Sequence, residues 1–358
     1  MRRAAATALA ALVGLVLCAP AAHAAGGGDK KPKPEKPRSA VTLGAVGDTM
    51  LGNSPELPAE PGSYLDPVKG QLRGDVVFGN LEGTLTDVSG SPKCGGPSGG
   101  DCFAFRTPPS YARHLAAAGF TVMNDANNHS YDFGLAGLEQ TIAALHGAGI
   151  AQTGLPGEVT VVKAGGEKVA FVGFAPYSMT ASLLDLPAAR KLIRQATRRA
   201  PIVVVAIQAG AEGSAAQHVT GDEEHYLGED RGNPRKFARM AVRPGADLVL
   251  GSGPHVLRGM EIYRDRLIAY SLGNFSGFHN FATEGVLGAS AVLHVTLDPD
   301  GALRSGRIAS VRLIEAGRPV PDPSGEGADL IRRLSREDLG QGAVRIGGKG
   351  RILGRVGE

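Results

Sequence analysis

The feature that most constrains the fold is an alternation of short apolar runs with helical segments, which begins at Val41. "VTLGAVGD" and "PIVVVAIQ" have the length and continuous apolar character of strands that are buried on both faces. "LAGLEQTIAALHGAG" has helical spacing, and the segments around Gly165-Gly166 and "DPDG" indicate two hairpins. Strands that alternate with helices predict an α/β domain.

The first residues are typical of an exported protein. Residues 1–24 combine a basic start, a short apolar stretch and the small residues of "AHA", which predicts a secretory signal peptide cleaved near Ala24. Cys18 offers lipid attachment as an alternative, but Leu17 stands where a small residue is expected before a lipidated cysteine. We therefore expect the protein outside the cytoplasmic membrane, either secreted or associated with the cell envelope.

Composition divides the rest of the chain into three parts. Residues 25–40 are rich in Pro and Lys and indicate an extended linker. Residues 41–316 carry the strand and helix pattern and form the predicted domain. Residues 317–358 are rich in Gly, Pro, Arg and Asp, so we expect a C-terminal extension with one helix in "ADLIRRLSREDL" and a disordered end.

The charge balance excludes nucleic acid as a partner. The net charge is +3, and removal of residues 1–24, which hold two arginines and no acid, would leave +1. A nucleic-acid surface needs clustered basic residues. The one basic cluster, "DKKPKPEKPR", lies in the predicted linker, where a solvated spacer is favoured over a polyanion-binding arm.

Two cysteines remain after cleavage, Cys94 and Cys102, on either side of "GGPSGGD". The Gly-rich segment allows its two ends to meet, and an even pair in an exported protein indicates a disulfide. A cysteine-based metal site is the alternative.

Polar residues stand at the points where the predicted strands end. The stretch "MNDANNHSYDFG" places three Asn, one His and two Asp between a strand and a helix. Ligands bind at the C-terminal ends of strands in α/β sheets, so we expect one shared site rather than separate turns and helix caps. Its members are Asp48, Asn80, Glu82, Asn128, His129, Gln208, Glu212 and His255.

The blocks "GDTMLG", "GNLEGTLT", "NNHSYDFGLAGLEQT", "GADLVLGSGPHV" and "IAYSLGNF" resemble those of the bacterial capsule-synthesis family CapA, also called poly-γ-glutamate synthesis proteins. The resemblance runs from about Val41 to Leu313, with the blocks in family order. It implies a calcineurin-like metallophosphoesterase-type fold: an α/β four-layer α-β-β-α sandwich of two mixed sheets with outer helices.

The resemblance also implies roles for the strand-end residues. Metal ligands are expected at Asp48, Glu82, Asn128 and His255. His129 is expected to donate a proton or orient a phosphate, and Glu212 is assigned a second catalytic role. The residues expected to bind substrate are Asn80, Gln208, Ser252 and Asn274.

Three departures from the family pattern weaken the expected metal site. Gln208 and Ser252 stand where the family usually has His, and Met50 stands where the phosphoesterase class has the His of Asp-x-His. Amide and hydroxyl oxygens bind transition metals more weakly than imidazole does. We therefore expect one divalent ion, Mn²⁺, Mg²⁺ or Zn²⁺, or none.

These observations leave three functions open. The chain is either a metal-dependent hydrolase or transferase acting on an anionic envelope polymer of the poly-γ-glutamate type, or a non-catalytic polymer-binding or export-complex subunit with a degenerate metal site. An ordinary metallophosphoesterase is the third alternative. Membrane-bound capsule synthesis proteins are expected as partners, whereas a Ser252–His255 nucleophile and base pair is disfavoured because no GxSxG elbow is present.

Overall fold

The computed structural model describes residues 38–94 and 102–356. The predicted signal peptide, Cys18 and most of the predicted linker lie outside the described residues. Within the described ranges, no helix has the length and apolar character needed to cross a bilayer.

A ten-stranded mixed sheet forms one half of the domain. Its main path runs β19-β20-β17-β16-β1-β2-β5-β6, with β15 paired to β1 and β18 paired to β17. The strands are β1 (Val41–Thr49), β2 (Val76–Leu81), β5 (Val122–Asn124), β6 (Ala151–Thr153), β15 (Asn274–Ser276), β16 (Ala289–Leu297), β17 (Leu303–Ile314), β18 (Arg318–Pro321), β19 (Val344–Ile346) and β20 (Arg351–Arg355).

A six-stranded mixed sheet forms the other half, in the order β13-β14-β12-β9-β8-β7. Its strands are β7 (Thr160–Ala164), β8 (Glu167–Phe174), β9 (Ile202–Gln208), β12 (Leu248–Ser252), β13 (Met260–Tyr263) and β14 (Arg266–Ala269). Two short ribbons are added by β3 (Thr84–Leu85) with β4 (Arg106–Thr107) and by β10 (His225–Tyr226) with β11 (Glu229–Asp230).

Seven helices are assigned in the described part of the chain. They are α1 (Asp66–Lys69), α2 (Ala112–Ala118), α3 (Gly134–Gly147), α4 (Leu186–Arg199), α5 (Pro234–Val242), α6 (Gly285–Gly288) and α7 (Glu326–Leu339). Short 3₁₀ turns occur at Pro61–Ser63, Pro109–Tyr111, Gly340–Gly342 and Gly348–Gly350. Side-chain caps help to set where α4 and α5 begin, because Asp185 accepts from the Ala188 N–H and Asn233 accepts from the Lys236 N–H.

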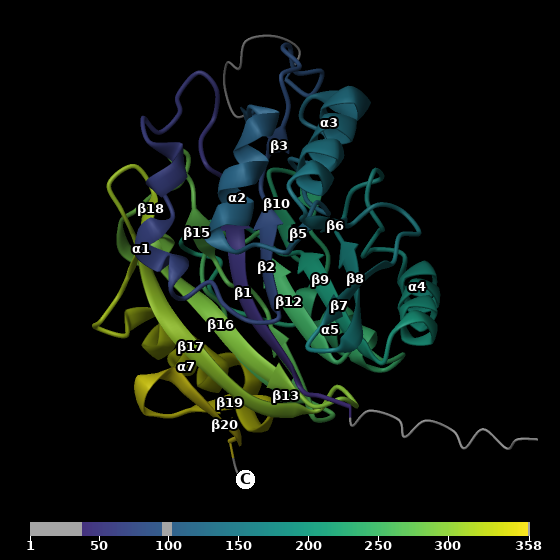
Figure 1. Cartoon of the computed structure of the whole chain (residues 1–358). Coiled ribbons are helices and arrows are strands. Elements are labelled where there is room, and N and C mark those ends of the chain that lie inside the picture. Colours follow the sequence, from purple (N-terminus) through teal and green to yellow (C-terminus); the bar gives the residue numbers. More distant parts are fainter. Residues whose placement is uncertain (1–37, 95–101, 357–358) are drawn as a thin grey trace, which may run out of the picture. The chain divides into compact units, whose positions relative to one another are not determined.

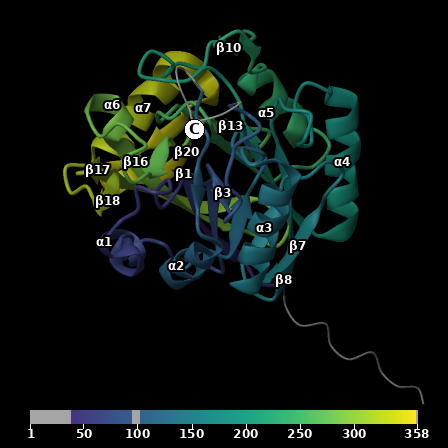
Figure 2. The same cartoon turned by 90° about the horizontal axis from the view of Figure 1, so that it is seen from above.

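The two sheets pack face to face around the main core. That core contains apolar side chains from both sheets, and the rings of Phe78 on β2 and Phe171 on β8 stack with their centroids 6.0 Å apart. A second core lies between the small sheet and helices α4 and α5, and a third lies between the large sheet and helices α1 and α2. Figures 1 and 2 show these helices on the outer flanks of the two sheets. The predicted four-layer α-β-β-α sandwich is thus confirmed.

The C-terminal residues differ from what we expected. Residues 317–356 do not form a partly disordered extension, because β18 and β20 pair with β17 and extend the large sheet. The predicted helix is present as α7, whose buried Ile331 and Leu334 belong to the main core. Burial of these two side chains gives the segment an apolar anchor that its Gly-rich composition does not reveal.

Candidate functional site

Strand register brings the predicted residues together at one edge of the sandwich. Strands β1, β2 and β5 run parallel, and Asp48, Asn80 and Asn124 are register partners across them. On its other side Asp48 pairs with Asn274 of β15. In the small sheet Gln208 of β9 is the partner of Ser252 on β12. The C-terminal ends of the parallel strands in both sheets therefore supply the site, as expected for such sheets.

Asn80 lies at the centre of this edge and joins the two sheets. Its Nδ2 lies 2.9 Å from Asp48 Oδ1 and 2.8 Å from Gln208 Oε1, and it also donates to Glu82. Its Oδ1 accepts a hydrogen bond of 2.8 Å from Asn124 Nδ2, which fixes the orientation of the amide. Asn80 thus directs its NH₂ group at the Asp48 and Glu82 carboxylates. In this orientation the amide donates hydrogen bonds to the two acids and does not offer its oxygen to a metal ion.

Gln208 extends the same network. Its Nε2 donates to Glu82 Oε1 at 3.1 Å and to Asn128 Oδ1 at 2.5 Å. Because its Oε1 accepts from Asn80, every polar atom of the Gln208 side chain is hydrogen-bonded. Gln208 therefore occupies the position of the expected imidazole with a satisfied set of hydrogen bonds.

His255 lies among three carboxylates, and with Asp48, Glu82 and Glu212 it forms what we call the carboxylate half. Its Nδ1 is 3.0 Å from Asp48 Oδ2, and its Nε2 is 3.9 Å from Glu82 Oε1 and 3.7 Å from Glu212 Oε2. Burial by itself would lower the pKa of His255, but the Asp48 carboxylate, with Glu82 and Glu212, raises it to about 10. Burial and the nearby Asp48 charge raise the pKa of Glu82 to about 8. A negative charge on Glu82 is thus disfavoured beside the Asp48 carboxylate.

Backbone geometry also holds this half in place. His255 has φ of 60°, in the left-handed region that non-glycine residues adopt infrequently. Its Nδ1 lies 2.9 Å from Asn274 Oδ1. A Cβ on Gly47 would lie 1.9 Å from the Gly273 carbonyl, so only glycine lets β15 approach β1 this closely.

His129 lies in different surroundings, and with Lys93, Phe105 and Asp132 it forms what we call the lysine half. Its Nδ1 is 2.8 Å from Asp132 Oδ2, which also accepts from the Phe105 N–H at 2.7 Å. Burial lowers the pKa of His129, against the opposing effect of Asp132. A neutral imidazole that donates its Nδ1–H to Asp132 keeps a lone pair on Nε2.

The Lys93 ammonium completes the lysine half. Its Nζ is 2.7 Å from Asp132 Oδ1 and 2.9 Å from the Asn128 carbonyl oxygen. Cys94, the next residue, forms a disulfide with Cys102, with the two Cα atoms 5.7 Å apart. The disulfide therefore joins the two chain segments from which Lys93 and Phe105 contact Asp132.

Arg231 connects the carboxylate half to a neighbouring loop. Its Nη1 lies 2.6 Å from Glu212 Oε1, and its Nε lies 2.9 Å from Glu229 Oε2. The loop itself is held by the fully buried Arg258, which makes paired contacts of 2.9 and 2.7 Å with Glu224. Glu212 is thus held by Arg231 on one side and faces His255 on the other.

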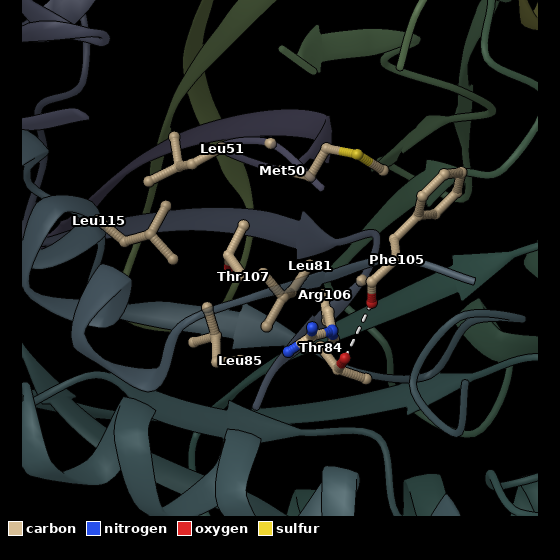
Figure 3. Close-up of a pocket in the computed structure, with 11 residues that line it drawn as sticks. Met50, Leu51, Leu81, Thr84, Leu85, Phe105, Arg106, Thr107 and Leu115 are labelled. Carbon is tan, nitrogen blue, oxygen red and sulfur yellow. Dashed lines mark hydrogen bonds between the residues drawn. The ribbon is translucent and has the colours of Figure 1, made fainter. Parts of the chain in front are cut away.

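The predicted residue Ser252, and Met50, which stands where the phosphoesterase class has His, contribute less than the other residues. Ser252 Oγ donates to the Ile207 carbonyl at 3.3 Å, so its hydroxyl is bound to the backbone of β9. Met50 lies on an apolar cavity of about 10 Å³ with Leu81 and Leu115. Figure 3 shows Met50 and Phe105 towards one end of this cavity and Leu115 towards the other. Met50 therefore packs among apolar side chains and supplies no imidazole at this position.

Three residues that complete the site were not predicted from the sequence: Lys93, Asp132 and Arg231. They come from loops, where no strand pattern marks them. Asp132 had one local signal, because it stands three residues after His129 in the same polar stretch. For Lys93 and Arg231, only the packing of the loops reveals the contact.

The donor set of the carboxylate half fits a divalent cation that prefers oxygen ligands. Asp48 and Glu82 supply carboxylate oxygens and His255 supplies an imidazole, and a bound cation would relieve the repulsion between the Asp48 and Glu82 carboxylates. Binding would require His255 to lose its proton. Among the residues described here, no three His, Cys, Asp or Glu side chains are grouped as a ready metal site, so the single metal ion stays a prediction.

Comparison with known proteins gives a consistent result. The model of the family "Bacterial capsule synthesis protein PGA_cap" matches residues 42–277. The "PGA biosynthesis protein CapA" of Bacillus subtilis is 28% identical over 253 residues, which cover 64% of this chain and 61% of that protein. The "Capsule biosynthesis protein CapA" of Bacillus anthracis is 30% identical over 250 residues, which cover 63% of this chain and 56% of that protein. The chain thus spans about three fifths of the length of these relatives.

A solved structure is also similar. The crystal structure of a 5'-nucleotidase precursor from Thermus thermophilus matches with a TM-score of 0.43 and 14% identity, and the match covers 84% of this chain and 59% of that one.

Proposed function

Since this chain belongs to the bacterial capsule synthesis protein family PGA_cap, we propose that it handles an anionic envelope polymer of the poly-γ-glutamate type. The names of the relatives in the two Bacillus species refer to PGA and to capsule biosynthesis, which supports this polymer class. The pattern of residues 1–24 supports a location outside the cytoplasmic membrane, secreted or in the cell envelope. Membrane-bound proteins of capsule synthesis are the proposed partners.

One observation supports a catalytic function: the carboxylate half and the lysine half, which differ chemically, lie at the same edge of the sandwich. Asp48, Glu82 and His255, with Asn128 beside them, would hold one divalent ion. Such an ion supplies Lewis-acid activation of a water molecule or a substrate oxygen when it is bound. The proposed reaction is hydrolysis or transfer at a linkage of the polymer.

His129 and Glu212 have distinct tasks in this proposal. His129 is kept neutral by burial and is oriented by Asp132, so its Nε2 accepts a proton from the attacking group and returns it to the leaving group. Arg231 keeps Glu212 directed at His255 and so fixes the position of the imidazole.

The non-catalytic alternative also has a specific observation in its favour. Gln208 satisfies its hydrogen bonds with Asn80, Glu82 and Asn128, so its side chain is held without a metal ion. An ordinary metallophosphoesterase is less well supported, because Met50 faces an apolar cavity where that class has His.

Metal per chain, measured by mass spectrometry after identical dialysis, tests the catalytic version. We expect at most one Mn²⁺ or Mg²⁺ per wild-type chain, none in Asp48→Asn, and wild-type binding in the control Asp265→Asn, whose carboxylate is exposed in the β13–β14 turn. The same samples are then incubated with poly-γ-glutamate, and chain length is followed by size-exclusion chromatography. Shortening of the polymer by wild type but not by Asp48→Asn supports hydrolysis, whereas binding without shortening favours the non-catalytic alternative.

A second variant, in which the two missing imidazoles are restored, tests the number of metal ions per chain. Gln208→His combined with Ser252→His is expected to raise the metal content towards two ions, because imidazole binds transition metals better than amide or hydroxyl oxygen. Two tightly held ions in the wild type would contradict the assignment of the ligands.

A further inference from the structure

A cavity beside the lysine half has no role in the reaction described so far. Its volume is about 360 Å³, at the small end of the range of about 300–1,000 Å³ that is usual for ligand pockets. Its lining comes from four separate segments: Pro92 and Lys93, Asn127 with Asn128 and Tyr131, Tyr177 and Met179, and Glu229. Because Asn128 belongs to both, the cavity adjoins the candidate site directly.

The Lys93 ammonium has a donor left for a ligand in this cavity. It carries three N–H groups. One donates to Asp132 Oδ1 and one to the Asn128 carbonyl oxygen. The nearby His129 Nδ1, at 3.4 Å, does not accept, because it donates its own hydrogen to Asp132. One third of the Lys93 side chain is exposed, so the remaining N–H is accessible.

The other walls are apolar surfaces with a hydrogen-bonding rim. Tyr131, Tyr177 and Met179 contribute rings and a flexible thioether, which suit the methylene groups of a ligand. The Tyr177 hydroxyl donates to Glu229 at 3.2 Å, and Arg231 lies over the Tyr177 ring at 5.7 Å. Arg231 pairs with Glu229 as well as with Glu212, and among the described residues that line the cavity Lys93 is the only cation.

We propose that this cavity binds one carboxylate-bearing unit of the polymer, with the carboxylate on Lys93 and the methylenes against Tyr131 and Tyr177. The proposal rests on the proposed function, because it specifies how the same polymer is held. A unit bound there presents its linkage to the next unit towards Asn128 and His129. One available N–H satisfies one oxygen of a carboxylate, whereas a phosphate presents three strong acceptor oxygens and would leave more of them without a donor.

The test compares two ligands and four proteins by calorimetry. The ligands are a γ-glutamyl trimer with free α-carboxylates and the same trimer with α-carboxamides. The proteins are the wild type, Lys93→Gln, Lys93→Arg and the control Lys163→Gln, whose lysine is exposed on β7. Lys93→Gln is expected to weaken binding of the carboxylate trimer about tenfold or more, because a hydrogen bond to a charged group is lost. Lys93→Arg is expected to restore most of the affinity, and Lys163→Gln to change nothing.

The two ligands separate recognition from structural support. The carboxamide trimer is expected to bind the wild type about tenfold more weakly, and Lys93→Gln is expected to have no further effect on it. Equal losses of both ligands in Lys93→Gln, or a fall in its melting temperature that Lys93→Arg shares, would assign Lys93 a purely structural role and overturn the proposal.

Two further outcomes identify which idea fails. Carboxylate trimer binding that survives in Lys93→Gln overturns the subsite while leaving the proposed function intact, and no binding to the wild type overturns both. Inorganic phosphate is the competitor that tests the other source of negative charge. Displacement of the trimer by phosphate at concentrations below the dissociation constant of the trimer would show a phosphate site. That result would overturn the carboxylate assignment.

Discussion

The two halves of the site use histidine in opposite ways. In the carboxylate half, the imidazole of His255 faces Asp48, Glu82 and Glu212, and these raise its pKa to about 10. In the lysine half, burial lowers the pKa of His129, and Asp132 is shared with the Lys93 ammonium and the Phe105 N–H. One histidine therefore serves as a cation that neutralises acids, and the other serves as a neutral base.

This difference shows that charge, rather than residue type, assigns the roles. Both histidines follow a strand end and both lie near a carboxylate, so their sequence contexts look alike. What separates them is the number of acids around each imidazole and the presence of a second cation. The edge of the sandwich is thus acidic around His255 and close to neutral around His129, where Lys93 offsets Asp132.

The largest expected effect comes from removing the acid that holds the lysine half together. Asp132→Ala leaves His129, Lys93 and the Phe105 N–H without their shared partner. Because Asp132 is fully buried, we expect the free energy of unfolding to fall by about 3 kcal/mol. Urea denaturation measures this, with Asp87→Ala as the control for an exposed acid. A loss below about 1 kcal/mol would mean that Asp132 does not organise this half.

The comparison between the halves is sharpened by one substitution in each. His255→Gln removes the cation from among three acids and is expected to cost about 2 kcal/mol at neutral pH. His129→Gln removes one hydrogen bond of a neutral ring and is expected to cost about 1 kcal/mol. Denaturation of both variants under identical conditions gives the ranking, and the reverse order would contradict the assigned charges.

The disulfide should affect one half and spare the other. Cys94→Ser with Cys102→Ser opens a loop with a sequence separation of 8 residues, for which chain entropy predicts a loss of about 2 kcal/mol. Lys93 and Phe105 flank this loop, so side-chain NMR signals of His129 should shift while those of His255 stay in place. Equal shifts in the two rings would show that the halves are not independent.

The smallest effect concerns a histidine outside both halves. His294 on β16 is the register partner of Arg307, and burial, with Arg73 and Arg307, lowers its pKa to about 4. The unfolded chain binds this proton more readily, near pH 6.5, so stability is complete above that value and falls as the pH drops towards 4. Since the ring is partly exposed, we expect a loss of about 1 kcal/mol. In His294→Gln the stability curve between pH 6.5 and 4 should be flatter by this amount.

Much of the fold could be predicted because its strands are short, apolar and punctuated. "PIVVVAIQ" corresponds to β9 and the "DPDG" turn to the β16–β17 hairpin. The end of the chain could not be predicted in this way. β20 is only partly buried, and it is ordered through pairing with β17, a distant partner that local composition does not indicate.

The site could be predicted where it follows strands and not where it depends on loops. Asp48 and Asn80 follow from their positions at strand ends, and register then makes them neighbours. Lys93 lies in a Pro- and Gly-rich segment that is typical of a spacer, and Arg231 is 19 residues from the Glu212 that it contacts. Ser252 shows the opposite error, since the right position carries a hydroxyl that faces the backbone.

The position of Asn80 between the two sheets has a consequence for how the site forms during folding. Its amide contacts Asp48 from the first part of the sequence and Gln208 from the second, so neither sheet alone carries a complete site. A half-folded molecule therefore lacks the complete set of site residues. The complete site would form in a single step, when the second sheet docks on the first, and it would be lost in the same step whenever the sheets separate.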